Sequence, residues 1–115
     1  ADEKRREIGA RLSGLKDGDL AGAMKMAEEL SKRDDLGEVL ELMKGWYRDA
    51  IVVAEGAPEL AVNSDMIAGL QSRGAGFNRL WNAFSVIEVA RRDIMAPRNA
   101  NKQLAMEVMM LGIIA

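Results

Sequence analysis

The sequence predicts an all-α fold, a bundle of five to six helices in a single domain that covers residues 1–115. Apolar residues recur every three or four positions in successive segments, which is the spacing of one helix face. No segment alternates β-branched and polar residues over the length of a strand. Capping and turn residues separate the periodic segments, and 49% hydrophobic with 30% charged residues is typical of a globular protein.

The first two helices are predicted on either side of a turn. Residues 2–14 carry apolar residues at helical spacing, and the turn sequence KDGD at 16–19 ends this helix. Asp19 precedes the apolar stripe of residues 20–33, where its carboxylate can accept a hydrogen bond from a backbone N–H of the first turn. We therefore expect Asp19 to cap the second helix.

The third helix is predicted over residues 36–54, where apolar residues keep the helical spacing for the whole segment. Asp35 and Glu38 form a capping-box pattern at its start, in which each side chain binds the backbone N–H of the other residue. The sequence EGAP at 55–58 is expected to end this helix.

Two further helices are predicted before the C-terminal segment. Asn63 or Ser64 can cap a brief helix that runs through Leu70, and glycines then break the chain. A long helix follows over 77–95, and Pro97 marks its end because a proline disfavours the helical conformation in the residue before it.

The last predicted helix begins at Asn99 or Asn101, and from Leu104 onward its only charged side chain is Glu107. A helix that is apolar all round needs neighbours on every side. One face carries Leu104, Val108, Leu111 and Ala115. The opposite face carries Met106, Met109, Met110 and Ile113. We expect the methionine face to be a subunit interface, because unbranched thioethers adapt to irregular surfaces. The alternative is a helix that is buried on all sides at the centre of the bundle.

The composition argues against several classes of function. The formal net charge is -2, so the strong positive field of a dedicated nucleic-acid-binding module is missing. The chain has no cysteine and no histidine, which removes thiolate nucleophiles, the commonest metal ligand and the commonest general base. We expect no catalytic activity, no cofactor and no bound metal. The apolar C-terminal run is too short to cross a bilayer, and the absence of cysteine fits a reducing compartment such as the cytoplasm.

Four short segments occur in the order WYRD at 46–49, NSD at 63–65, ARRDI at 90–94 and NANKQLAMEVMML at 99–111. Through them the chain resembles, over residues 20 to 111, the C-terminal domain of the bacterial DNA polymerase III delta-prime subunit, a component of the sliding-clamp loader. The resemblance implies a helical collar domain of a longer subunit, packed against the collar domains of the delta and tau or gamma subunits in a pentameric ring. It implies no ATPase activity for this domain and only indirect contact with DNA. The sequence departs from the family's common pattern at Lys102, where proline is frequent.

The same segments contain residues for which we expect structural roles. Trp46 and Tyr47 lie on the inward stripe of their helix. Arg48 and Asp49 lie at the edge of that stripe, where a charged pair can tie helices together. Capping or turn roles are expected for Asn63, Asp65, Asn99 and Asn101.

The last segment adds Leu104 and Glu107 to these residues. Glu107 is the one carboxylate in an otherwise apolar stretch, so it should find a basic partner or a cap. We expect that partner to be Arg91 or Arg48.

A helical nucleic-acid-binding domain is the alternative function. Its candidate phosphate-binding residues are Arg73, Arg79, Arg91, Arg92 and Arg98. Phosphate neutralisation would make such binding strongly dependent on salt. The acidic balance of the chain argues against this alternative.

Overall fold

The computed structural model describes residues 2–66, 69, 76–96 and 101–115. These residues form five α-helices, and no strand is found among them, which confirms the predicted all-α class. The α-helices are α1 (Asp2–Ser13), α2 (Leu20–Ser31), α3 (Leu36–Ala54), α5 (Phe77–Met95) and α6 (Lys102–Ile114). Two short 3-10 turns, η1 (Pro58–Leu60) and η2 (Ser64–Met66), follow α3.

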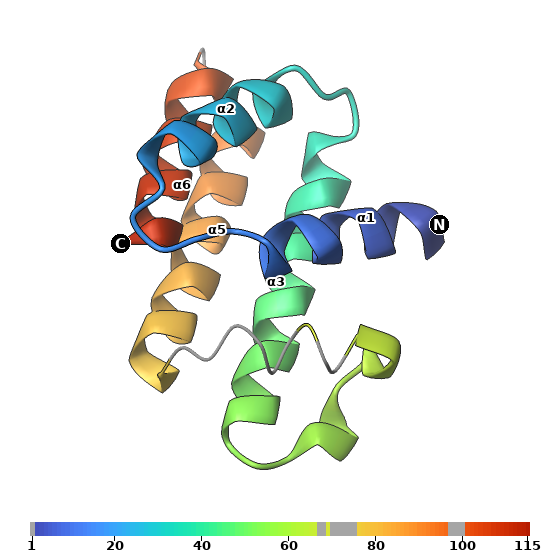
Figure 1. Cartoon of the computed structure of the whole chain (residues 1–115). Helices are drawn as coiled ribbons and strands as arrows, with labels where there is room; N and C mark the ends of the chain where they lie inside the picture. The colour runs from blue at the N-terminus through green and yellow to red at the C-terminus, as the bar shows by residue number, and fades with distance from the viewer. Residues whose placement is uncertain (1, 67–68, 70–75, 97–100) are drawn as a thin grey trace.

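Three helices, α3, α5 and α6, run side by side, and α1 and α2 cross them (Figure 1). Helices α3 and α5 are antiparallel, and two ion pairs join them: Lys44 bonds Glu88 at 2.7 Å, and Arg91 bonds Glu41. The main contacts of α2 are with α6, whereas α1 packs mainly on α3. The C-terminal end of α6 is held at the α1–α2 turn, where the Gly18 backbone N–H donates to the carbonyl of Ile114 at 2.9 Å.

The helix ends show which capping predictions hold. The Asp19 side chain accepts a hydrogen bond from the Gly22 N–H at 2.9 Å, and the Asn101 side chain accepts one from the Leu104 N–H at 2.9 Å. Both residues are therefore N-caps, as predicted. Helix α5 ends at Met95, and the next residue is extended, as expected before a proline.

The predicted capping box of Asp35 and Glu38 is wrong. Asp35 precedes α3, but its side chain makes no capping hydrogen bond. Its carboxylate is bound instead by Arg33 at 2.7 Å and by Lys4 at 2.8 Å, and these partners hold the pKa of Asp35 well below its usual value. Two cations in contact attract a carboxylate more strongly than one backbone N–H does.

The brief helix predicted from Asn63 or Ser64 is described only in its first turn, η2, where the Met66 N–H donates to the carbonyl of Asn63 at 2.9 Å. The rest of that predicted helix, through Leu70, falls largely on residues 67–68 and 70, which lie outside the described residues. Asn99, the other predicted start of the last helix, also lies outside them.

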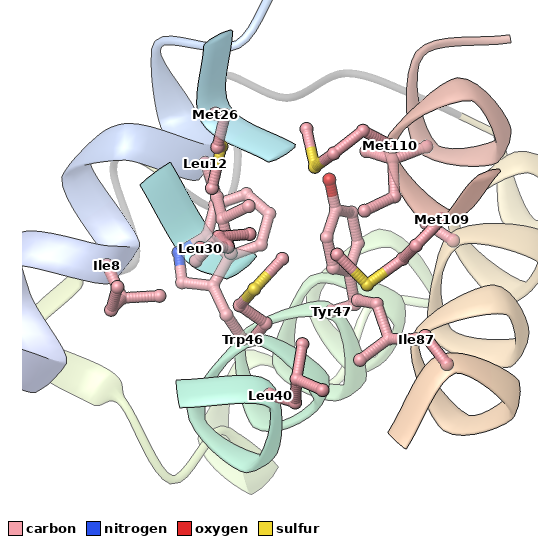
Figure 2. Packing of buried hydrophobic residues seen from close by; sticks show 14 of the residues in the cluster. Ile8, Leu12, Met26, Leu30, Leu40, Trp46, Tyr47, Ile87, Met109 and Met110 are labelled. Carbon is pink, nitrogen blue, oxygen red and sulfur yellow. The ribbon is translucent and has the colours of Figure 1, made fainter. Parts of the chain in front are cut away.

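The core is built around two neighbouring aromatic residues of α3 (Figure 2). Trp46 and Tyr47 are both buried, and their rings meet edge to face with centroids 5.0 Å apart. Consecutive residues on a helix point about 100° apart, so these two rings pack against different neighbours. Buried residues of all five described α-helices belong to this single core.

The structure corrects the prediction of which α6 face is available to a partner. The four residues assigned to the interface, Met106, Met109, Met110 and Ile113, are each at most 1% exposed. They fill the interior between α2, α3 and α5, where flexible thioethers suit irregular space. The opposite face is the exposed one: Leu104 is 54%, Val108 62% and Leu111 45% accessible to solvent.

A charge at Met106 tests this assignment. Met106→Glu places an unpaired carboxylate in the core, so we expect it to lower the free energy of unfolding by about 3 kcal/mol or more. Val108→Glu introduces the same charge on the exposed face and should change that free energy by no more than about 0.5 kcal/mol. Urea denaturation followed by circular dichroism measures both. Equal losses for the two variants would contradict the assignment.

A second prediction concerns the close approach of α5 and α6. A Cβ atom at Gly112 would lie 2.9 Å from Cγ1 of Val86, a β-branched side chain with little rotational freedom. Gly112→Ala should therefore destabilise the chain by about 1 kcal/mol, although alanine favours helices. Adding Val86→Ala should recover part of the loss. A double-mutant cycle in thermal denaturation measures the coupling, and strictly additive effects would exclude the contact.

Candidate subunit interface

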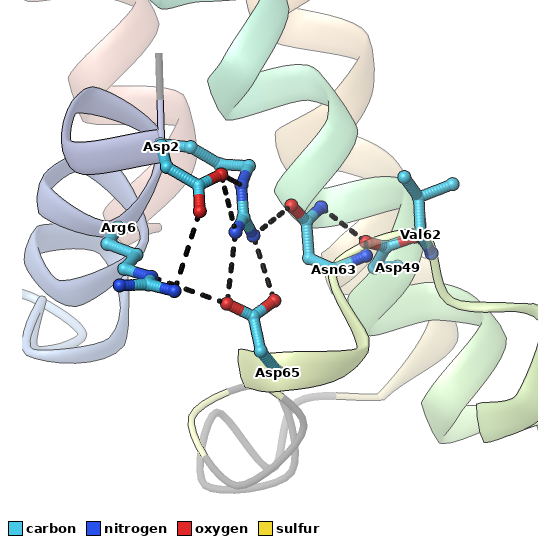
Figure 3. Close-up of polar contacts among 7 residues, drawn as sticks. Asp2, Arg6, Asp49, Val62, Asn63 and Asp65 are labelled. Carbon is cyan, nitrogen blue, oxygen red and sulfur yellow. Dashed lines mark hydrogen bonds and ion pairs between the residues drawn. The ribbon is translucent and has the colours of Figure 1, made fainter.

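A polar cluster joins α3 to the segment that follows η1 (Figure 3). The carboxylate of Asp49 is fully buried and accepts hydrogen bonds from the backbone N–H groups of Val62 at 3.0 Å and Asn63 at 2.8 Å. The side-chain amide of Asn63 donates to the same carboxylate. Asp49 therefore satisfies backbone donors that would otherwise be unpaired inside the protein.

The expected role of the Arg48–Asp49 pair is wrong in one respect. Arg48 does contact Asp49, at 3.3 Å, but the two residues are neighbours on one helix and this contact joins no second helix. The cross-connection comes from Asp49 alone, through its hydrogen bonds to residues 62 and 63.

Arg5 of α1 completes the cluster from the other side. Its guanidinium donates to Asn63 at 3.0 Å, to both oxygens of Asp65 at 2.9 and 3.0 Å, and to Asp2 at 3.1 Å (Figure 3). A guanidinium suits this position because its planar fork can bind a carboxylate through two parallel bonds. Sequence reasoning missed Arg5, since its partners lie 58 and 60 positions away along the chain.

In the structure, the side chains of Asn63 and Asp65 have roles other than the capping or turn roles predicted from the sequence. The carbonyl of Asn63 does accept the first bond of η2, but its side chain belongs to the polar cluster. Asp65 is an ion-pair partner, and the hydrogen bond from Arg5 lowers its pKa to about 2. Among the described residues, no group of acidic side chains is arranged to hold a metal ion. The cluster thus holds residues 62–65 on α3 and α1.

The pKa of Asp65 predicts a dependence of stability on pH. Because the pKa is lowered in the folded state, the stabilisation is complete above about pH 4 and is lost as the pH falls towards 2. Asp65→Asn should therefore unfold more easily than the parent chain at neutral pH, and the difference should disappear as the pH falls through about 2. Thermal melts across this range measure it. Glu59→Gln, at an exposed carboxylate, is the control and should show no such trend.

Most of the described arginines that a nucleic-acid-binding domain would use already form ion pairs within the chain. Arg79 bonds Asp17 at 2.7 Å and also donates to the carbonyl of Ile114. Arg91 bonds Glu41, while Arg92 is exposed. Arg73 and Arg98 lie outside the described residues. Two of the three described arginines are thus already paired with carboxylates.

The expected partner of Glu107 is also corrected. Its carboxylate accepts a hydrogen bond from Gln103 at 3.5 Å, one turn earlier on α6, and neither Arg91 nor Arg48 bonds it. Arg91 and Arg48 lie on α5 and α3, where each has its own carboxylate.

An exposed apolar surface remains once the core is complete. It consists of Val89 of α5 and of Leu104, Val108 and Leu111 of α6. We call these four residues together the α6 face. Each of their side chains is between 45% and 62% exposed. Contiguous exposed apolar surface of this kind marks sites of association in proteins. The sequence predicted the interface on the other side of α6, which the core buries.

A groove between α5 and α6 runs into the α6 face and has a volume of about 600 Å³. Its walls are Val86 and Val89 on one side and Leu104 and Val108 on the other. No described helix is long and apolar enough to cross a membrane. The apolar walls of the groove, together with the exposed side chains beside it, are typical of a surface that binds a partner.

Comparison with known proteins supports this interpretation. Residues 3–114 match the family described as "DNA polymerase III, delta subunit, C terminal". No curated protein and no solved structure gives a significant match. The chain therefore belongs to this family of C-terminal domains of DNA polymerase III, which are structural modules of the clamp loader and interact with its other subunits.

Proposed function

We propose that this domain is an assembly module of the delta-prime subunit in the bacterial replicative clamp loader. It holds that subunit beside the delta and tau or gamma subunits in the pentameric ring that loads the sliding clamp onto primed DNA in the cytoplasm. The domain carries no chemistry of its own, and it meets DNA only through the whole complex.

The exposed α6 face carries this proposal. Leu104, Val108 and Leu111 remain accessible on α6 although the other side of the helix lies in a closed core. Covering such side chains with a partner removes apolar area from water, which is a main source of association free energy. Because the chain belongs to a clamp-loader family, we infer that the partner is another subunit of the clamp loader.

The delta-prime assignment is supported by the sequence segments at 46–49, 63–65 and 99–111. Each contributes a residue with a definite place in the fold: Trp46 lies in the core, Asn63 binds Asp49, and Asn101 caps α6. These segments therefore fix the shape of the domain that presents the α6 face.

The test places a charge on the α6 face of the full-length subunit. Val108→Asp or Leu104→Asp should weaken binding to the delta and tau or gamma subunits at least tenfold, or about 1.4 kcal/mol, because the carboxylate must be desolvated at the contact. Gel filtration of reconstituted mixtures and titration calorimetry measure the effect.

Val62→Asp is the matched control, because Val62 is 75% exposed and lies between η1 and η2, in a segment that is bonded to α3. All three variants should keep the helical content of the parent chain. The proposal is rejected if the unaltered subunit binds none of the other subunits, or if Val62→Asp weakens binding as much as Val108→Asp does.

A further inference from the structure

We propose that Arg79 of α5 is a positioning residue for subunit assembly, because it holds the last turn of α6 in the place where Leu111 meets the partner. This inference rests on the proposed function, since it concerns how the α6 face is kept in position for binding.

The carbonyl groups at the end of α6 are bonded by other parts of the fold. A helix leaves its last four carbonyls without partners of its own. The carbonyl of Gly112 accepts a hydrogen bond from the side-chain amide of Asn82 at 3.2 Å. The carbonyl of Ile114 accepts one from the Gly18 N–H at 2.9 Å and another from the Arg79 guanidinium at 3.3 Å. Groups from α5 and from the α1–α2 turn therefore meet at the last turn of α6 (Figure 1).

Arg79 links these groups to one another. Its guanidinium also bonds Asp17 at 2.7 Å, in the turn between α1 and α2. One side chain of α5 thus contacts both the α1–α2 turn and the end of α6. A positive charge is favourable at this position, because the carbonyl end of a helix carries a partial negative charge.

The Arg79 side chain is 35% exposed, and an ion pair with that much access to water contributes little to the stability of a whole domain. Removal of Arg79 should therefore loosen the last turn of α6 while the core remains folded. This difference makes a positional role separable from a general stabilising role.

Leu111 connects this contact to the α6 face. It is 45% exposed and directly precedes Gly112, where the backbone of α6 lies close against Val86 of α5. Leu104 belongs to the same face but lies at the other end of α6, beside the cap of Asn101. Movement of the last turn should therefore displace Leu111 and leave Leu104 in place.

The experiment uses the full-length subunit with the delta and tau or gamma subunits. Arg79→Met removes the charge and both contacts but keeps a long side chain, and it should weaken binding at least about threefold in titration calorimetry. Hydrogen exchange of the amides in the last turn of α6 should become several-fold faster, while exchange in α3 stays unchanged.

Arg11→Met is the matched control. The Arg11 side chain is also 35% exposed, and its ion pair with Glu29 at 2.8 Å joins α1 to α2 without contacting α6. This variant should leave both the binding and the exchange of α6 unchanged.

A double-mutant cycle shows whether Arg79 acts through Leu111. Arg79→Met should cause little further loss of binding in a Leu111→Ala background, but its full loss in a Leu104→Ala background. A residue that only stabilises the domain would weaken binding equally in both. If Arg79→Met does not melt cooperatively, Asn82→Ala replaces it, because Asn82 bonds the carbonyl next to Leu111 and the same pattern is expected.

The outcomes separate this inference from the proposed function. Equal losses in the two backgrounds, or binding by Arg79→Met that matches Arg11→Met, would overturn the positioning role. If Val108→Asp still disrupts the complex in that case, the proposed function stands. If the unaltered subunit binds none of the other subunits, the proposed function fails and this inference fails with it.

Discussion

The architecture depends on how much of α6 the remaining helices can cover. This helix is apolar on both sides, and α2, α3 and α5 together enclose only the side that carries its methionines. The enclosed side chains complete a core that already contains the aromatic pair of α3. The other side of α6 stays exposed because no further helix among the described residues covers it. That exposed side is the surface for which we propose a role in assembly, while the enclosed side is part of the core.

A second constraint operates on the opposite flank of the molecule, where the chain after α3 has little regular structure of its own. Two 3-10 turns cannot pair all of their backbone groups, and Asp49 of α3 accepts hydrogen bonds from the N–H groups of residues 62 and 63. Arg5 of α1 holds the same segment through the side chains of Asn63 and Asp65. A fully buried carboxylate is tolerated there because it receives several hydrogen bonds at once. This cluster and the α6 face lie on different parts of the fold, so one flank holds the domain together while the other is available to partners (Figures 1 and 3).

Family membership and surface chemistry point in the same direction. A clamp-loader C-terminal domain associates with other subunits, and the described surface offers an apolar face and a groove. Covering these apolar side chains with a partner removes them from water, which is a main source of association free energy.

The sequence alone determined the helical class, the approximate bounds of α1, α2, α3, α5 and α6, and the caps at Asp19 and Asn101. These features depend on side chains within a few positions of one another, so periodicity and capping rules reveal them. Only the tertiary structure decided which side of α6 is buried and that α5 and α6 leave a groove between them. The same holds for the long-range ion pairs, in which Arg5 bonds Asp65 and Lys4 bonds Asp35 beside Arg33. A helix with two apolar sides carries no local signal for which one faces inward. That choice depends on where helices distant in the sequence come to lie.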